Sequence, residues 1–114
     1  GTAVSYVRVK LVMNWVDNTT GNIVSGDNLP NVTLNSDNSW FLGSDGIYYY
    51  KMPVAANGGK TTNLLNTPIE QNNAPEGCHL EVTVLAESIQ AAPSAAVEGA
   101  WKVTVGSDGN LTAK

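Results

Sequence analysis

The chain offers few side chains that could act as nucleophiles, bases or metal ligands. It has one cysteine, Cys78, next to its one histidine, His79. Neighbours in a strand point to opposite faces, so these two cannot converge on one metal ion or substrate atom. With a single histidine we find no zinc-protease helix motif and no serine triad. We therefore predict no catalytic residue, and we expect Cys78 to be a partly buried small apolar group without an intramolecular disulfide.

The acidic residues are spaced for turns rather than for catalysis. Glu81 and Glu87 lie six residues apart in an expected strand, about 20 Å, which is too far for a glycosidase pair. The aspartates sit in turns rich in Asn and Gly, where their side chains bond to nearby backbone: Asp17, Asp27, Asp37, Asp45 and Asp108. Residues 17–22 and 35–38 come nearest to a calcium loop without matching its pattern. We predict no cofactor, and calcium in one of these turns stays an alternative.

The aromatic residues could form a platform for sugars or a hydrophobic core. They are Trp15, Trp40, Tyr48, Tyr49, Tyr50 and Trp101. Strands favour such residues in any case, so a role in the core and on sheet faces is the preferred interpretation. We predict that Trp40, Tyr49, Ile89 and Trp101 are largely buried.

Two long alternating segments must position these residues. Residues 3–16 and 79–89 alternate with period two, which predicts two long strands, each with one buried face. Shorter strands are expected at 23–25, 32–34, 47–52, 61–65 and 103–105, and residues 56–59 resemble a hairpin turn. Residues 91–101 contain the only helix candidate, near residues 93–100. The spacing predicts an all-β fold: a jelly-roll-like, two-sheet antiparallel β-sandwich with one short helix.

Composition excludes several classes of function. The chain has 114 residues, of which 14% are charged, with a net charge of −4 and only six Lys and Arg. Nucleic acid and anionic membrane surfaces both need a basic face, so neither is an expected partner. No apolar run approaches the roughly 18 residues of a membrane span. The chain is long enough for one domain with a modest core.

Three stretches, in this order, resemble one protein family. The first is residues 5–11, SYVRVKL; the second is Trp40 followed by SDGIYYYK at 44–51; the third is LEVTVLAESIQA at 80–91, followed by Trp101. This pattern is similar to the TasA/camelysin family of exported Gram-positive proteins, which a dedicated signal peptidase processes. The residues that carry it are Trp40, Asp45, Gly46, Tyr48, Tyr49, Tyr50, Lys51, Glu87, Ile89, Gln90 and Trp101. Below we call them the signature residues.

The resemblance implies a function at the cell surface or in a biofilm matrix. It predicts a secreted, non-catalytic structural protein, either a fibre subunit or an accessory. The alternatives are a metal-dependent peptidase of the camelysin type, for which no zinc-ligand set is recognisable, and a carbohydrate-binding module suggested by the aromatics. The family's leader and first strand have no counterpart here. We therefore expect residues 1–114 to form a single β-sandwich domain lacking both.

The same absence predicts a mode of assembly. A sheet without its first strand would expose unpaired N–H and C=O groups, which can accept a strand from another chain. The segment 4–16 carries only Arg8 and Lys10 as charged guards. The expected partners are therefore other copies of the chain, joined by a donated N-terminal strand, or other matrix proteins. A monomer with a covered edge is the alternative.

Overall fold

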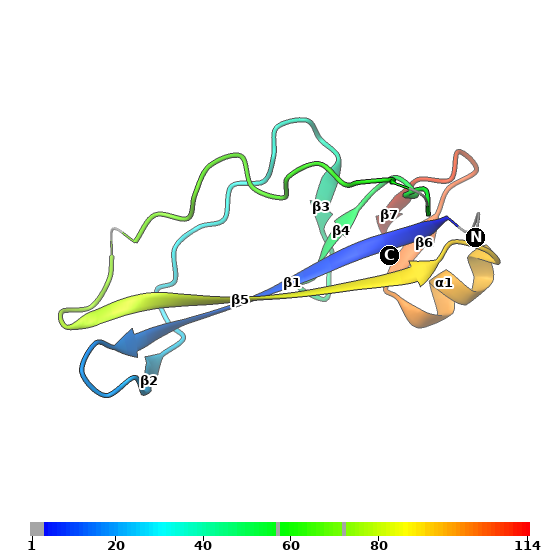
Figure 1. The fold of residues 1–114 in the computed structure, drawn as a ribbon. Helices are drawn as coiled ribbons and strands as arrows, with labels where there is room; N and C mark the ends of the chain where they lie inside the picture. The colour runs from blue at the N-terminus through cyan, green and yellow to red at the C-terminus, as the bar shows by residue number, and fades with distance from the viewer. Residues whose placement is uncertain (1–3, 57, 72) are drawn as a thin grey trace.

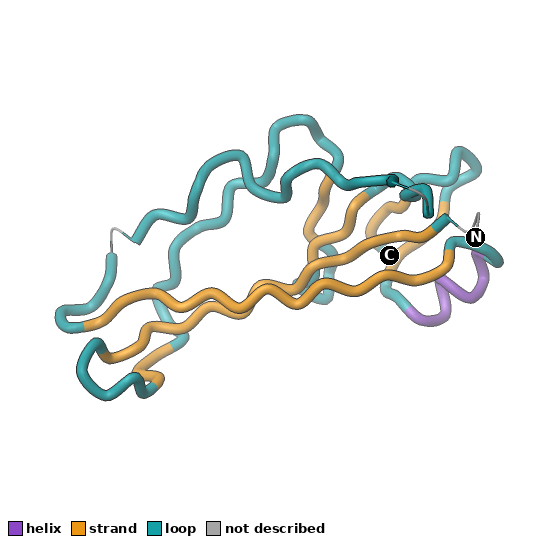
Figure 2. The backbone as a smooth tube through the Cα atoms, in the orientation of Figure 1, coloured by secondary structure: helices purple, strands orange, loops and turns teal. Residues whose placement is uncertain are grey.

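Two long antiparallel strands run the length of the molecule and organise the rest of it. The computed structural model describes residues 4–56, 58–71 and 73–114. Its elements are β1 (Ser5–Asp17), β2 (Ile23–Ser25), β3 (Trp40–Leu42), β4 (Tyr48–Tyr50), β5 (Cys78–Gln90), α1 (Ser94–Ala100), β6 (Val103–Val105) and β7 (Leu111–Ala113). The β1–β5 pair gives the molecule its elongated shape, 49 × 25 × 25 Å, and long loops run along one side of it (Figures 1 and 2).

The larger sheet is built around β1. β5 pairs with β1 at thirteen successive positions, from Ser5 opposite Gln90 to Asp17 opposite Cys78. The other edge of β1 is shared: β4 pairs near Arg8 and Val9, β2 pairs near Trp15 and Val16, and β3 continues the sheet beyond β4. All of these pairings are antiparallel. The predicted all-β, antiparallel fold is confirmed, and so are both long strands.

The prediction that β1 buries only one face is wrong, because core residues pack on both sides of it. We call the side of Tyr6, Arg8 and Val16 the Arg8 face, and the side of Val9 and Trp15 the Val9 face. Tyr6, Trp15 and Val16 are 3%, 1% and 1% exposed, and Val9 is also buried. One hydrophobic cluster includes Tyr6, and a separate cluster includes Val9. Alternation alone could not show this, since the even-numbered residues include Arg8, Lys10 and Asn14.

The C-terminal elements cover the Arg8 face. β6 and β7 form a second, two-stranded antiparallel sheet, and α1 precedes it. Val97 of α1, Val103 of β6 and Leu111 of β7 are fully buried in the cluster with Tyr6 and Tyr49. The N–H of Trp101 donates to the Val97 carbonyl at 2.8 Å and ends the helix. The predicted short helix and second sheet are therefore confirmed. Among the described residues, α1 has seven residues, and no helix has the length and apolar character of a membrane span.

Several of the predicted short strands are shorter in the structure or are irregular segments. Residues 32–34 and 61–65 are irregular, and only Leu34 and Leu65 form an isolated bridge. The strand expected at 47–52 is limited to β4, because the chain turns through Lys51 and Met52 before Pro53. Asn and Thr side chains compete for backbone hydrogen bonds in such segments, as when the Asn35 amide donates to the Asn63 carbonyl. Asn57, in the expected hairpin turn at 56–59, lies outside the described residues, as do Gly1, Thr2, Ala3 and Asn72.

Three of the four residues predicted to be buried are so. Trp40, Tyr49 and Trp101 are 5%, 0% and 6% exposed, whereas Ile89 is only half-buried against the Arg8-face cluster. Ile89 lies near the end of β5, and in the part of the chain that the structure describes no further strand pairs with the outer edge of β5 to complete the cover.

Truncating Trp101 should therefore destabilise the fold. We expect Trp101→Ala to lower the free energy of unfolding by about 3–5 kcal/mol, and the melting temperature by roughly 10–20 °C. Ile23→Ala is the control, because Ile23 is 67% exposed; its change should stay within about 0.5 kcal/mol. Thermal unfolding followed by circular dichroism measures both, and equal melting temperatures for the two variants would contradict this assignment of the core.

Candidate functional site

Five signature residues converge around Arg8 on the Arg8 face. Glu87 of β5, Arg8 of β1, Tyr49 of β4 and Phe41 of β3 lie in one row across four strands. Arg8 Nη2 lies 3.0 Å from Glu87 Oε1, and its Nε lies 3.1 Å from the same oxygen. The signature residues gathered here are Asp45, Tyr49, Glu87, Ile89 and Trp101. We call this arrangement the Arg8 row.

The Arg8 guanidinium also contacts two aromatic rings of this face. Its central carbon lies 4.6 Å from the centroid of the Trp101 ring, a cation–π distance. Its Nη1 donates to the Tyr49 hydroxyl at 3.5 Å. The Tyr49 ring stacks on Phe41 at 5.4 Å between centroids and meets Trp101 at 5.8 Å. With Tyr49 fully buried and Arg8 engaged on three sides, the row is built for cohesion between β1, β4, β5 and the segment after α1.

Asp45 fixes the turn between β3 and β4 to this row. Its Oδ1 accepts the Ile47 N–H at 3.1 Å, its Oδ2 accepts the Tyr49 hydroxyl, and Gly46 beside it has a φ of 80°, which favours glycine. Partial burial raises the pKa of the Asp45 carboxyl, but the hydrogen bonds from Tyr49 and Ile47 and the charge of Arg8 outweigh it, so the pKa lies below 3.8. Burial, and then the hydrogen bond to Asp45, raise the pKa of Tyr49.

The remaining signature residues lie elsewhere. Trp40 and Tyr50 meet edge to face on the Val9 face at 5.0 Å, where Tyr48 also packs. Lys51 Nζ donates to Asn38 Oδ1 at 2.9 Å near the surface, and Gln90 is exposed at the end of β5. The signature set therefore divides between two faces and the surface.

The outer edge of β5 is the largest feature that sequence reasoning missed. In the described part of the chain, β5 pairs with β1 alone, so its other edge has no strand beside it. Side chains from Glu81 to Ser88 are exposed on both faces, including Val82, Val84 and Leu85 at 39%, 60% and 50%. The alternation of β5 predicted one buried face, which is wrong for this stretch because no sheet or helix of the described residues covers it. No local signal marks this edge, because Glu87 is the one charged residue among residues 82–88, a share no lower than the 14% of the whole chain.

Which backbone groups face outward follows from the ladder. The Ala91 N–H donates to the Val4 carbonyl at 2.8 Å, so the odd-numbered residues of β5 bond to β1. The even-numbered residues therefore direct their N–H and C=O groups outward. Consistent with this, the Leu80 N–H reaches the Gln71 side chain at 3.0 Å, and the Cys78 N–H reaches the Pro75 carbonyl at 3.0 Å. Within the described residues, no such contact satisfies the N–H groups of Val82, Val84, Ala86 and Ser88.

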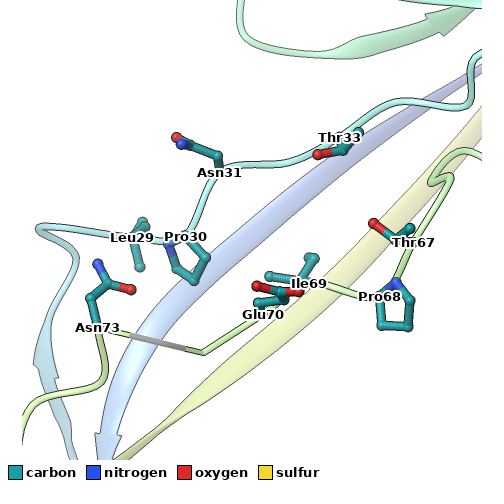
Figure 3. A pocket seen from close by; sticks show the side chains of 9 residues that line it. All are labelled: Leu29, Pro30, Asn31, Thr33, Thr67, Pro68, Ile69, Glu70 and Asn73. Atoms are coloured by element: carbon teal, nitrogen blue, oxygen red, sulfur yellow. The ribbon is translucent and has the colours of Figure 1, made fainter.

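Two open hollows flank the long loops. One, of about 500 Å³, lies on the Val9 face between residues 61–65 and the β1–β5 pair, and Val84 and Ala86 carry it to the edge of β5. The other, of about 480 Å³, lies between two loops. Figure 3 shows its lining: Leu29, Pro30, Asn31 and Thr33 from one loop, and Thr67, Pro68, Ile69, Glu70 and Asn73 from the other. Glu70 is the one ionisable side chain in that lining, which is too little to define a chemistry.

Cys78 and His79 take no common role. Cys78 is half-buried, and the His79 ring contacts the Asn18 side chain and, at 3.5 Å, Glu81. Among the described residues, no group of three or more His, Cys, Asp or Glu side chains is placed to hold a metal ion. Asp17 and Asp37 bond to neighbouring groups of their own turns, such as the N–H groups of Thr19 and Ser39. Hydrogen bonds from the N–H groups of Thr20 and then Thr19 lower the pKa of Asp17, and those from the hydroxyl and then the N–H of Ser39 lower the pKa of Asp37.

Comparison with known protein families, curated proteins and solved structures finds no significant match to this chain.

The lowered pKa of Asp45 predicts how stability depends on pH. A carboxyl whose pKa is lower in the folded state stabilises the fold above its ordinary pKa, and this contribution is lost as the pH falls through the lowered value. Asp45→Asn should therefore be less stable than the unaltered protein at neutral pH, and the difference should shrink below about pH 4. Denaturant unfolding from about pH 7 to pH 2 measures it.

Asp27→Asn serves as the control for this experiment, because no hydrogen bond from the described residues reaches the Asp27 carboxylate. Its free energy of unfolding should follow that of the unaltered protein. A pH-independent difference between Asp45→Asn and the unaltered protein would contradict the role given to the Asp45–Tyr49 hydrogen bond.

Proposed function

We propose that this chain is a secreted or cell-surface structural protein of an extracellular matrix, a fibre subunit or accessory of the TasA/camelysin type, without catalytic activity. The observation that carries the proposal is the open outer edge of β5. A strand edge with unpaired N–H and C=O groups is a template for another strand, and strand addition joins subunits in many assemblies.

The devices that usually protect an edge strand are missing from residues 82–88. Monomeric proteins guard such edges with lysines, prolines, bulges or short strands. Here Glu87 is the one charged residue, and it is held by Arg8. β5 is also long, pairs with β1 at thirteen successive positions without a register shift, and exposes Val84 and Leu85. These features support the proposal that another molecule covers the outer edge of β5 in the assembled state.

The position of β1 changes the expected route of assembly. The sequence suggested that residues 4–16 form an exposed edge, but β1 is an interior strand with β5 on one side and β4 and β2 on the other. Alternation cannot tell an interior strand from an edge strand. The accepting edge that we propose is therefore the outer edge of β5.

The buried aromatics bear on the carbohydrate alternative. A sugar platform needs exposed ring faces, whereas Trp40, Tyr49 and Trp101 are at most 6% exposed. Their burial supports the structural role instead.

A direct test follows the protein in the cells that produce it and in solution. We expect fractionation and immunogold labelling to place it outside the cell, and sedimentation to show a mass that rises with protein concentration. Zinc analysis after dialysis and a casein-cleavage assay on the same sample should give neither bound zinc nor cleavage. Stoichiometric zinc with chelator-sensitive cleavage would establish the peptidase instead, and an intracellular, strictly monomeric protein would refute the proposal.

A further inference from the structure

We propose that the partner at the outer edge of β5 is a second copy of the same strand, paired antiparallel around a twofold axis at Leu85. This inference rests on the proposed function and names its partner. The resulting dimer joins the two larger sheets into one continuous sheet through β1–β5–β5–β1.

The open part of the edge sets where a second strand can pair. At the start of β5, the outward N–H groups of Cys78 and Leu80 are already satisfied by Pro75 and Gln71. From Val82 to Ser88 the outward groups are unsatisfied by any described residue. Pairing centred on Leu85 sets Val82 opposite Ser88 and Val84 opposite Ala86 of the second copy. The four N–H and four C=O groups that face outward from this run in each copy then all form hydrogen bonds with the second copy.

Charge and apolar side chains select the same centre. Centring the axis on Val84 would place Glu81 opposite Glu87 of the second copy at both ends, and like charges directly opposite are destabilising. Centring it on Thr83 would require the Leu80 N–H to bond to the second copy, but this group already donates to the Gln71 side chain. Centring it on Ala86 would set Glu87 against Leu85. With the axis at Leu85, Glu87 lies opposite Thr83, and Leu85, half-exposed in one chain, meets its own copy.

The Val9 face gains most from this pairing. A twofold axis perpendicular to the sheet keeps each face on its own side, so the two Val9 faces become one surface. Val84 and Ala86, which border the hollow of about 500 Å³, would then lie beside the same residues of the second copy. Each copy contributes this one hollow, and the exposed apolar rims of the two copies cover each other. Val84, which is 60% exposed in the single chain, loses the most contact with water.

The strength of the dimer follows from its size. One strand pair buries less than the roughly 1,200–2,000 Å² of a stable complex, so we expect a dissociation constant in the micromolar range or weaker. The association is therefore concentration-dependent.

Ala86→Pro tests the edge without altering the β1–β5 ladder. The Ala86 N–H points outward, so proline removes one donor from each copy in the proposed dimer and none from the bonds to β1, and its ring obstructs an added strand. We expect sedimentation equilibrium to show dimerisation weakened, with the dissociation constant raised by at least about tenfold. Ala86→Thr, which keeps the N–H and favours strands, is the matched control and should associate like the unaltered protein. Circular dichroism of the dilute variants verifies the fold.

Cysteine cross-linking tests the register independently. Leu85 faces its copy as a non-hydrogen-bonded pair, whose Cα atoms lie about 4.5 Å apart, within the range of a disulfide. In a Cys78→Ser background, Leu85→Cys should form a cross-linked dimer rapidly under mild oxidation. Thr83→Cys lies on the same face but four residues from its copy, so it should not.

The outcomes separate the two proposals. Loss of dimer in Ala86→Pro with cross-linking at position 85 supports the inference. Association that persists in Ala86→Pro, or faster cross-linking at position 83 than at 85, overturns this pairing while leaving assembly through another surface intact. A protein that stays monomeric at every concentration and forms no cross-link overturns both the pairing and the proposed self-association.

Discussion

The thirteen-residue ladder between β1 and β5 is the constraint on which the rest of the structure depends. The two strands are far apart in sequence, and their pairing brings the N-terminal and C-terminal halves of the chain together. Most other elements take their place from them: β4 and β2 pair with the edge of β1 opposite β5, β3 follows β4, and α1 begins just after β5. Two strands of this length leave one long edge, and no strand of the described residues covers it.

The Arg8 row stabilises that ladder at the end where residues of α1, β6 and β7 pack against it. Its members come from β5, β1, β4 and β3, and Trp101 closes over it from the segment after α1. Beyond the row, toward the middle of β5, side chains on both faces become exposed. The row and the open run of residues 82–88 overlap at Glu87, whose side chain bonds to Arg8. Because an added strand would use the outward backbone groups of the even-numbered residues, the edge can accept a partner while the row stays intact.

Sequence reasoning succeeded where the physics is local and failed where it depends on neighbours. Period-two alternation predicted both long strands, and Ser94–Ala100 forms the expected helix. The burial of Trp40, Tyr49 and Trp101 followed from residue type in a chain with little charge. What covers each face of β1, and which strand lies at the edge, depends on the pairing order, which no local pattern encodes. The role of Arg8, a charge within an apolar strand, required the same knowledge, because Glu87 and Tyr49 reach it only through the fold.

Residue-resolved hydrogen exchange on β5 tests the central claim, an open edge that another chain covers, most directly. In dilute protein, the amides of Thr83, Leu85 and Glu87 should be protected by β1, whereas those of Val82, Val84, Ala86 and Ser88 should exchange rapidly. At high concentration the second set should become protected as well. Protection of the even-numbered amides in the dilute monomer would show that the edge is already covered. Rapid exchange that persists while the protein associates would show that assembly uses another surface.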